Sequence, residues 1–183
     1  MRLSNKEELI SYVLKGKRIK YMFFWGHQKS KHGITKSCFS QWYESPFAHE
    51  DITYKTAEHF MMAEKAKLFN DTKAFNKIIS AEEPGKAKRI GREIVNFEEQ
   101  IWLKNRFKIV QQANLLKFSQ DPELKKFILN TENRVLVEAS PVDPIWGIGM
   151  ASDHPDVESP KLWKGLNLLG FALMLVRDEL QRA

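Results

Sequence analysis

From Thr56 onward, apolar residues recur at the spacing of helices, and polar residues or prolines stand where each helix would begin. The longest such segment is "FEEQIWLKNRFKIVQQANLLKF", and we expect Asn96 and Glu99 to cap its start. Its apolar stripe consists of Ile101, Trp102, Ile109, Ala113 and Leu116. Further helices are predicted at 56–69 after the cap Thr56, at 71–80 after the cap Asp71, from Pro84 onward, at 122–130 after the cap Asp121, and at 162–181.

The first third of the chain has a different pattern. The segment "SNKEELISYVLKG" predicts a helix that begins with Ser4 and Glu7 as a capping box and ends at Gly16. Short strands are predicted at "IKYMFFWG" and, much later, at "RVLVEAS". Between His27 and Thr56 no period is sustained, which predicts a long, functional loop with short strands.

These elements predict a fold that is mainly α with a small β-sheet (α+β). The chain has no internal repeat, low-complexity stretch or Gly/Pro/Ser-rich linker. We therefore expect a single domain over residues 1–183, in which residues 1–20 form an N-terminal helical extension.

Composition and charge narrow the class of protein. The chain is 43% hydrophobic and 28% charged, as in ordinary globular proteins. Its first residues lack the apolar core of a secretory signal. Its longest apolar run (166–176) is shorter than the roughly 20 residues that span a bilayer. Cys38 is its one cysteine and cannot form an internal disulfide, which fits a reducing compartment. We expect a cytoplasmic protein without membrane contact. The net charge of +6 attracts phosphates, although a basic cluster is equally a solvated surface without a partner.

The segment "TAEHFMMAEK" carries the first candidate site. With Thr56 as N-cap, Glu58 lies in the first helical turn, where the helix dipole favours an ionised carboxylate suited to act as a base, nucleophile or cation stabiliser. Lys65 lies seven residues later on the same face as Glu58 and Met62, among apolar neighbours that would lower its pKa. The structural alternatives are an acid that only stabilises its helix and a lysine whose stem covers apolar surface.

A zinc site at the Glu58-His59 pair is excluded by spacing. Zinc-binding helices need a second histidine at a fixed distance, and Lys55 occupies the upstream position. The glycine fingerprints of phosphate and dinucleotide sites are also absent. The sequence therefore predicts neither a metal nor a cofactor.

The segment "VDPIWGIG" is the second candidate. Asp143 precedes Pro144 and is biased toward an extended conformation, Trp146 offers a flat ring, and Gly147 allows close backbone approach to a ligand. The alternative is a turn whose tryptophan fills the core. Downstream, Asn167 stands at a helix start, where backbone N–H groups meet phosphate, or where glycines simply allow close packing.

Taken in order, these motifs resemble the NADAR/YbiA-like family, which includes N-glycosidases acting on riboflavin-pathway intermediates and hydrolases that remove ADP-ribose from guanine. The resemblance spans most of the chain after the first helix. It is carried by "FFWG", "CFSQWYESPF", "YKTAEHFMMAEKA", "GR", "LLKFSQDPEL", "LVEASPVDPIWGIG" and "GLNLLGFALM".

The resemblance implies a YbiA-like fold and cleavage of the bond between ribose C1 and a nitrogen. It implies that Glu58, Asp143 and Lys65 are catalytic, the last through a Schiff base with the opened sugar. The residues implied to bind substrate are Trp102, Trp146, Arg92, Gly147, Asn167, Phe24 and Gly26, with Arg92 pairing the phosphate. The chain has "SQW" where many relatives have "SNF", and Gly26-His27 where they have two glycines.

Three functions remain open at this point. The first is an N-glycosidase for a small phosphoribosyl-type substrate, with water as the only co-substrate. The second is ADP-ribosyl hydrolysis on guanine in nucleic acid, which the positive charge favours. The third is a non-catalytic module that binds ADP-ribose or NAD. Oligomeric state has no signal in the sequence.

Overall fold

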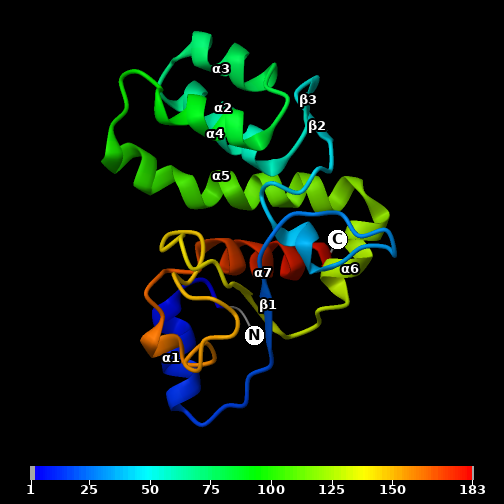
Figure 1. Cartoon of the computed structure of the whole chain (residues 1–183), viewed down its shortest axis with the longest axis vertical. Coiled ribbons are helices and arrows are strands. Elements are labelled where there is room, and N and C mark those ends of the chain that lie inside the picture. The colour runs from blue at the N-terminus through cyan, green and yellow to red at the C-terminus, as the bar shows by residue number, and fades with distance from the viewer. Residues whose placement is uncertain (1–2, 183) are drawn as a thin grey trace. The chain divides into compact units, whose positions relative to one another are not determined.

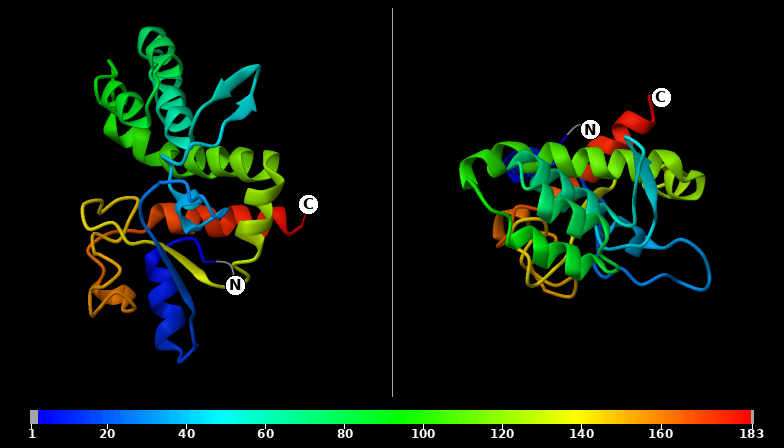
Figure 2. Two further views of the ribbon diagram at one scale, coloured as in Figure 1. Left: turned by 45° about the vertical axis from the view of Figure 1, so that its right-hand side comes forward. Right: turned by 90° about the horizontal axis from the view of Figure 1, so that it is seen from above.

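The computed structural model describes residues 3–182. The chain folds as two compact units (Figures 1 and 2). Residues 1–40 and 122–183 form the first, called here the terminal unit because it holds both chain ends. Residues 41–121 form the second, called the inserted unit.

The inserted unit is a group of helices around α2. It contains β2 (Phe47–His49), β3 (Ile52–Tyr54), α2 (Ala57–Leu68), α3 (Thr72–Ile79), α4 (Pro84–Arg92) and α5 (Glu99–Gln120). Helix α2 packs against α3, α4 and α5 (Figure 1). Because it has neighbours on several sides, nearly all its residues from Ala57 to Ala66 are buried.

The antiparallel hairpin of β2 and β3 is fixed to α2 by aromatic rings. Phe47 pairs with Tyr54 across the hairpin. The ring of Phe60 on α2 lies 5.9 Å from that of Phe47 and 4.9 Å from that of Tyr54, centroid to centroid. Phe60 therefore faces the hairpin.

The terminal unit is built on two parallel strands. It contains α1 (Lys6–Leu14), β1 (Tyr21–Phe24), the 3₁₀ helix η1 (Lys36–Phe39), α6 (Pro122–Leu129), β4 (Val135–Glu138), the 3₁₀ helix η2 (Pro160–Leu162) and α7 (Leu168–Leu180). Strands β1 and β4 pair from Tyr21 opposite Val135 to Phe24 opposite Glu138. Helix α7 packs on β4, and Gly170 makes this possible because a side chain there would overlap the Leu136 carbonyl.

The structure confirms the predicted fold class, mainly α with short strands, and most predicted helix starts. Thr56 and Asp71 cap α2 and α3 through their side chains, and Pro84 and Pro122 are the first residues of α4 and α6. No helix within residues 3–182 is long and apolar enough to cross a membrane.

Three predicted helix starts are wrong. Asn5, not Ser4, caps α1, since it accepts from the Glu8 N–H at 2.8 Å. Glu98, not Asn96, is the N-cap residue of α5, which begins at Glu99, and the Glu98 side chain makes no capping hydrogen bond. The last helix begins at Leu168, because residues 163–167 pair with the preceding loop instead.

Candidate active site

Glu58 lies at the buried start of α2. Its side chain is 2% exposed, and its backbone N–H donates to the Gln41 carbonyl at 2.9 Å. Thr56 caps the helix as predicted, with its hydroxyl accepting from the His59 N–H at 3.4 Å. The carboxylate thus lies at the positive end of the helix dipole, where its ionised form is favoured.

His59, the neighbour of Glu58, has a structural role. Its Nε2 lies 3.2 Å from the Ala81 carbonyl, which only accepts, so Nε2 carries the proton and Nδ1 accepts from the Thr56 hydroxyl at 2.9 Å. Burial lowers the pKa of His59, and Lys55 nearby acts in the same direction. Among residues 3–182, no three His, Cys, Asp or Glu side chains are placed to hold a metal ion.

Lys65 is held at the α2–α4 contact. Its Nζ donates to the Gly91 carbonyl at 2.7 Å and lies 4.3 Å from the ring centroid of Phe97 and 5.4 Å from that of Trp102. Burial lowers the pKa of the amine, as the sequence predicted. Met62 also meets Gly91, so the expected shared face of Met62 and Lys65 is the one that α4 covers.

The inserted unit carries four predicted site residues, Glu58, Lys65, Arg92 and Trp102, and two of them lie side by side. Trp102 from α5 lies beside Lys65. Arg92, the exposed last residue of α4, directly follows the carbonyl that binds Lys65. Seven residues of helix, a rise of about 10 Å, separate Lys65 from Glu58 on α2.

In the terminal unit, the predicted residues follow the carboxyl ends of β1 and β4, the edge at which parallel sheets usually bind ligands. Phe24 itself is 1% exposed and packs against Phe39 at 5.4 Å between ring centroids. Its side chain belongs to the core. Gly26, two residues on, has a left-handed backbone (φ 82°) and open space around it.

Asp143 organises the loop that follows β4. One carboxylate oxygen, Oδ1, accepts from the N–H groups of Ile145 at 2.9 Å and Trp146 at 2.8 Å. The carbonyl of Asp143 accepts from the Gly149 N–H at 3.2 Å. The other carboxylate oxygen has no hydrogen-bond partner within residues 3–182.

Gly147 and Asn167 hold this loop on the strand. A Cβ at position 147 would lie 2.8 Å from the Glu138 carbonyl oxygen, so the close approach expected of Gly147 is to the chain itself. Asn167 is fully buried with φ 55°, donates to the Leu136 carbonyl and accepts from the Glu138 N–H, both at 3.0 Å. These contacts give Asn167 a positioning role, because its amide is occupied by β4.

Sequence reasoning missed three buried polar residues of the inserted unit: Gln41, Asn114 and Lys117. The last two interrupt the buried apolar face of α5, between Val110, Ala113 and Phe118. Polar residues at helical spacing within an apolar stripe were the available signal.

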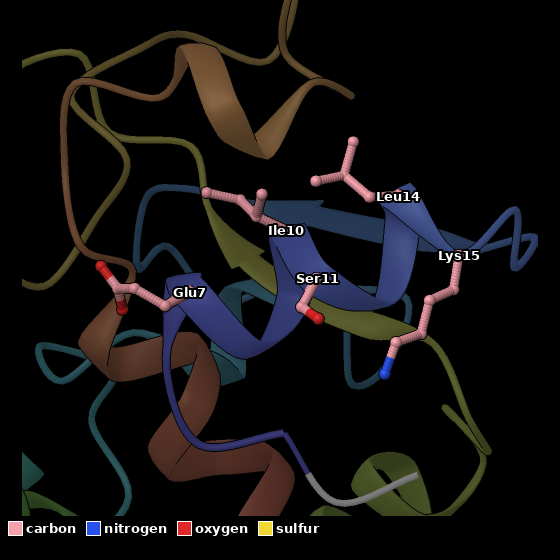
Figure 3. A pocket seen from close by; sticks show the side chains of 5 residues that line it. All are labelled: Glu7, Ile10, Ser11, Leu14 and Lys15. Atoms are coloured by element: carbon pink, nitrogen blue, oxygen red, sulfur yellow. The ribbon is translucent and has the colours of Figure 1, made fainter.

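A hollow on α1 is separate from all predicted site residues. It has a volume of about 400 Å³ and is lined by residues of α1 and Lys15 (Figure 3). Because none of its lining residues carries a predicted role, it has no part in the site.

Comparison with known proteins agrees with the resemblance seen in the sequence. Residues 23–181 match the NADAR domain. An N-glycosidase of Acanthamoeba polyphaga mimivirus is 44% identical over 89% of this chain and 98% of its own. The N-glycosidase YbiA of Escherichia coli is 31% identical over 79% of each chain. The NMR structure of the E. coli protein YbiA superposes on this chain with a TM-score of 0.72 and 26% sequence identity. The superposition covers 91% of this chain and 88% of that one. A maize protein named riboflavin biosynthesis protein PYRR is 34% identical over 70% of this chain but only 20% of its own length.

Proposed function

The chain belongs to the NADAR family of N-glycosidases, and we propose that it hydrolyses the bond between ribose C1 and a base or amine nitrogen in a phosphoribosyl-type substrate. Early intermediates of riboflavin synthesis are the substrates we favour, since two relatives that match this chain are named riboflavin biosynthesis proteins. The observation that carries the proposal is α2, which presents a buried carboxylate and a half-buried amine along one helix.

Glu58 has the properties that this cleavage needs. Departure of the nitrogen leaves positive charge on ribose C1 and the ring oxygen, and a nearby carboxylate stabilises that charge. A helix N-terminus favours the charged carboxylate that this purpose requires. The same carboxylate then accepts a proton from the attacking water.

Lys65 adds a covalent route. Its amine attacks C1 as the C1–N bond breaks, and the leaving nitrogen takes up a proton. The ring then opens to an iminium between C1 and Nζ, which water hydrolyses to the free sugar and the free amine. The lowered pKa of Lys65 increases the fraction of neutral, nucleophilic amine.

Other residues have proposed binding roles. Trp102 stacks on the base or ribose beside Lys65. Arg92 pairs the substrate phosphate through its guanidinium. The roles that the sequence predicts for the terminal unit are proposals for that unit by itself: Asp143 binds ribose hydroxyls or takes part in proton transfer through Oδ2, and Trp146 and the exposed backbone at Gly26 contact a ligand.

The test follows release of ribose 5-phosphate from a phosphoribosyl-aminopyrimidine. Glu58→Gln and Lys65→Arg should each lower kcat at least about 100-fold, because Gln is neutral and Arg cannot form a Schiff base. Lys67→Arg on the same helix is the matched control, since Lys67 pairs with Glu64 at 2.8 Å on the surface.

Borohydride trapping distinguishes the covalent route. Reduction during turnover should fix the sugar to Lys65 of the wild type and leave the Lys65→Arg protein unlabelled. Wild-type rates in both variants would refute the assignment of this site. Loss of turnover in Lys65→Arg, together with a wild-type protein that traps no sugar, would refute the covalent step alone.

A second candidate, removal of ADP-ribose from guanine in nucleic acid, is favoured by the net charge of +6 and by the basic helix α4. Binding of ADP-ribosylated DNA that weakens steeply with salt, together with release of ADP-ribose, would favour it over the first. No binding at low salt would eliminate it.

A further inference from the structure

Gln41 begins the inserted unit directly beside the start of α2. Its carbonyl accepts from the Glu58 N–H at 2.9 Å, and only 6% of the residue is exposed. Gln41 is therefore buried, and its backbone contacts the first helical turn, which carries the Glu58 carboxylate.

The orientation of its amide follows from its neighbours. Asn114 donates through Nδ2 to the Val110 carbonyl and to Oε1 of Gln41, both at 2.8 Å. A carbonyl only accepts, so the Asn114 atom must be the NH₂ group, and the Gln41 atom that faces it must be oxygen. Neither amide can be flipped without losing these bonds.

These hydrogen bonds use Oε1 of Gln41 and leave the two N–H donors of its Nε2 unused. Within residues 3–182, the buried Nε2 has no hydrogen-bond partner. An unmade hydrogen bond at a buried donor costs about 1–3 kcal/mol, so buried donors normally have an acceptor. Because the part of the chain that the structure describes supplies no acceptor for Nε2 of Gln41, we look for that acceptor on a ligand.

We propose that Nε2 of Gln41 donates a hydrogen bond to a neutral oxygen of the substrate, and that Gln41 thereby selects substrates. This inference rests on the proposed function. A neutral oxygen is favoured because the adjacent Glu58 carboxylate repels an anionic one, and because Oε1 is already occupied by Asn114. Two oxygens of an N-glycoside fit, a carbonyl on the leaving base and a hydroxyl of the ribose.

Such a contact discriminates strongly between substrates. A site that hydrogen-bonds a substrate group rejects the analogue lacking it, because its own buried group is then left unpaired. We expect removal of the Gln41 donor to cost about 10- to 100-fold in kcat/KM for the natural substrate.

The variant Gln41→Glu provides the sharpest test. It keeps the shape of the side chain and an oxygen that accepts from Asn114, and it replaces the two donors with a second acceptor. Gln41→Met, which has no donor, is the second variant should a charged glutamate disturb the fold. Gln111→Met on α5 is the matched control, since Gln111 is only partly buried and has no proposed role.

Three substrates should be compared with each protein: the phosphoribosyl-aminopyrimidinone, its analogue without the ring carbonyl, and its 2-deoxyribosyl analogue. The Gln41 variants should lose 10- to 100-fold against the first and nothing further against the analogue that lacks the contacted oxygen. That analogue identifies the oxygen as base carbonyl or ribose hydroxyl.

Equal losses on all three substrates, or no loss on any, would overturn the inference and make Gln41 a structural residue. Failure of the proposed function is read separately, from a wild-type protein that releases ribose 5-phosphate from none of them. In that case both proposals fall. Direct binding of intact substrate to a Glu58→Gln protein, with and without Gln41→Glu, gives the same comparison without turnover.

Discussion

Replacement of Gly91 by alanine tests whether the packing of α4 on α2 holds Lys65 in place. Gly91 is buried, and its carbonyl accepts from Lys65 Nζ at 2.7 Å. A Cβ added at this position would overlap Sδ of Met62 and lie 2.9 Å from its Cγ. Met62 is itself 6% exposed on α2, so it has little room to move.

The magnitude follows from this overlap. Overpacking a core by one methyl group costs about 1–3 kcal/mol. For a chain of this size, each kcal/mol lowers Tm by about 2–4 °C, so Gly91→Ala should lower Tm by roughly 2–12 °C. The alanine also displaces the acceptor of Lys65, so the rate of ribose release should fall although no proposed catalytic side chain has changed.

A double-mutant cycle with Met62→Ala isolates the contact. Met62→Ala alone should cost about 2–5 kcal/mol, because it leaves a cavity. In the double variant the new methyl enters that cavity, so the combined loss should be smaller than the sum by about 1–3 kcal/mol. The assay is denaturant unfolding of all four proteins, with initial rates measured beside it.

Additive free energies, within about 0.5 kcal/mol, would refute the packing argument. A Gly91→Ala protein that loses stability but keeps the wild-type rate would refute the link to Lys65.

Two further predictions concern pH and the loop after β4. Because burial lowers the pKa of His59 below 6.5, the unfolded chain takes up a proton that the folded chain refuses, so the free energy of unfolding should fall as pH drops below about 6.5, by at most about 1.4 kcal/mol per pH unit. Denaturant midpoints should follow this slope in the wild type and lose it in His59→Gln, and an unchanged slope in that variant would contradict the assignment. Asp143→Ala should cost about 1–3 kcal/mol, because it removes the acceptor of two N–H groups, whereas Asp143→Asn keeps that acceptor and should restore the melting temperature. If Asn also restores full ribose release, Asp143 has a structural role only.

The parts of the fold that the sequence predicted correctly depend on local signals. Thr56 and Asp71 begin helices because their side chains accept from N–H groups three residues later. Pro84 and Pro122 begin helices because a missing N–H costs nothing in the first turn. Such interactions lie within one turn, so the surrounding sequence contains all the information that decides them.

Where the structure gives a predicted site residue a structural partner, that partner lies far away in the sequence. Asn167 resembles a residue that frees helix N–H groups for phosphate, but its amide is occupied by a strand about thirty residues earlier. Phe24 resembles a ligand contact, but its ring packs against Phe39. The neighbouring sequence does not indicate that these partners lie close in the fold. A motif match alone therefore could not decide whether Asn167 and Phe24 support the structure or bind the ligand.

Glu58 and Lys65 differ from the other predicted site residues because both are charged groups on a helix that is largely buried. A helix covered on nearly every side has little solvated face, so Glu58 and Lys65 lose water that an alanine or leucine there would not need. Their position is therefore costly to stability, although the helix dipole offsets part of the cost for Glu58. The variant Glu58→Gln, which should lose turnover, also tests this cost to stability. It removes the buried charge, so its free energy of unfolding should be at least that of the wild type. If Glu58 only stabilised its helix, the same change would lower the free energy of unfolding by about 0.3–1 kcal/mol.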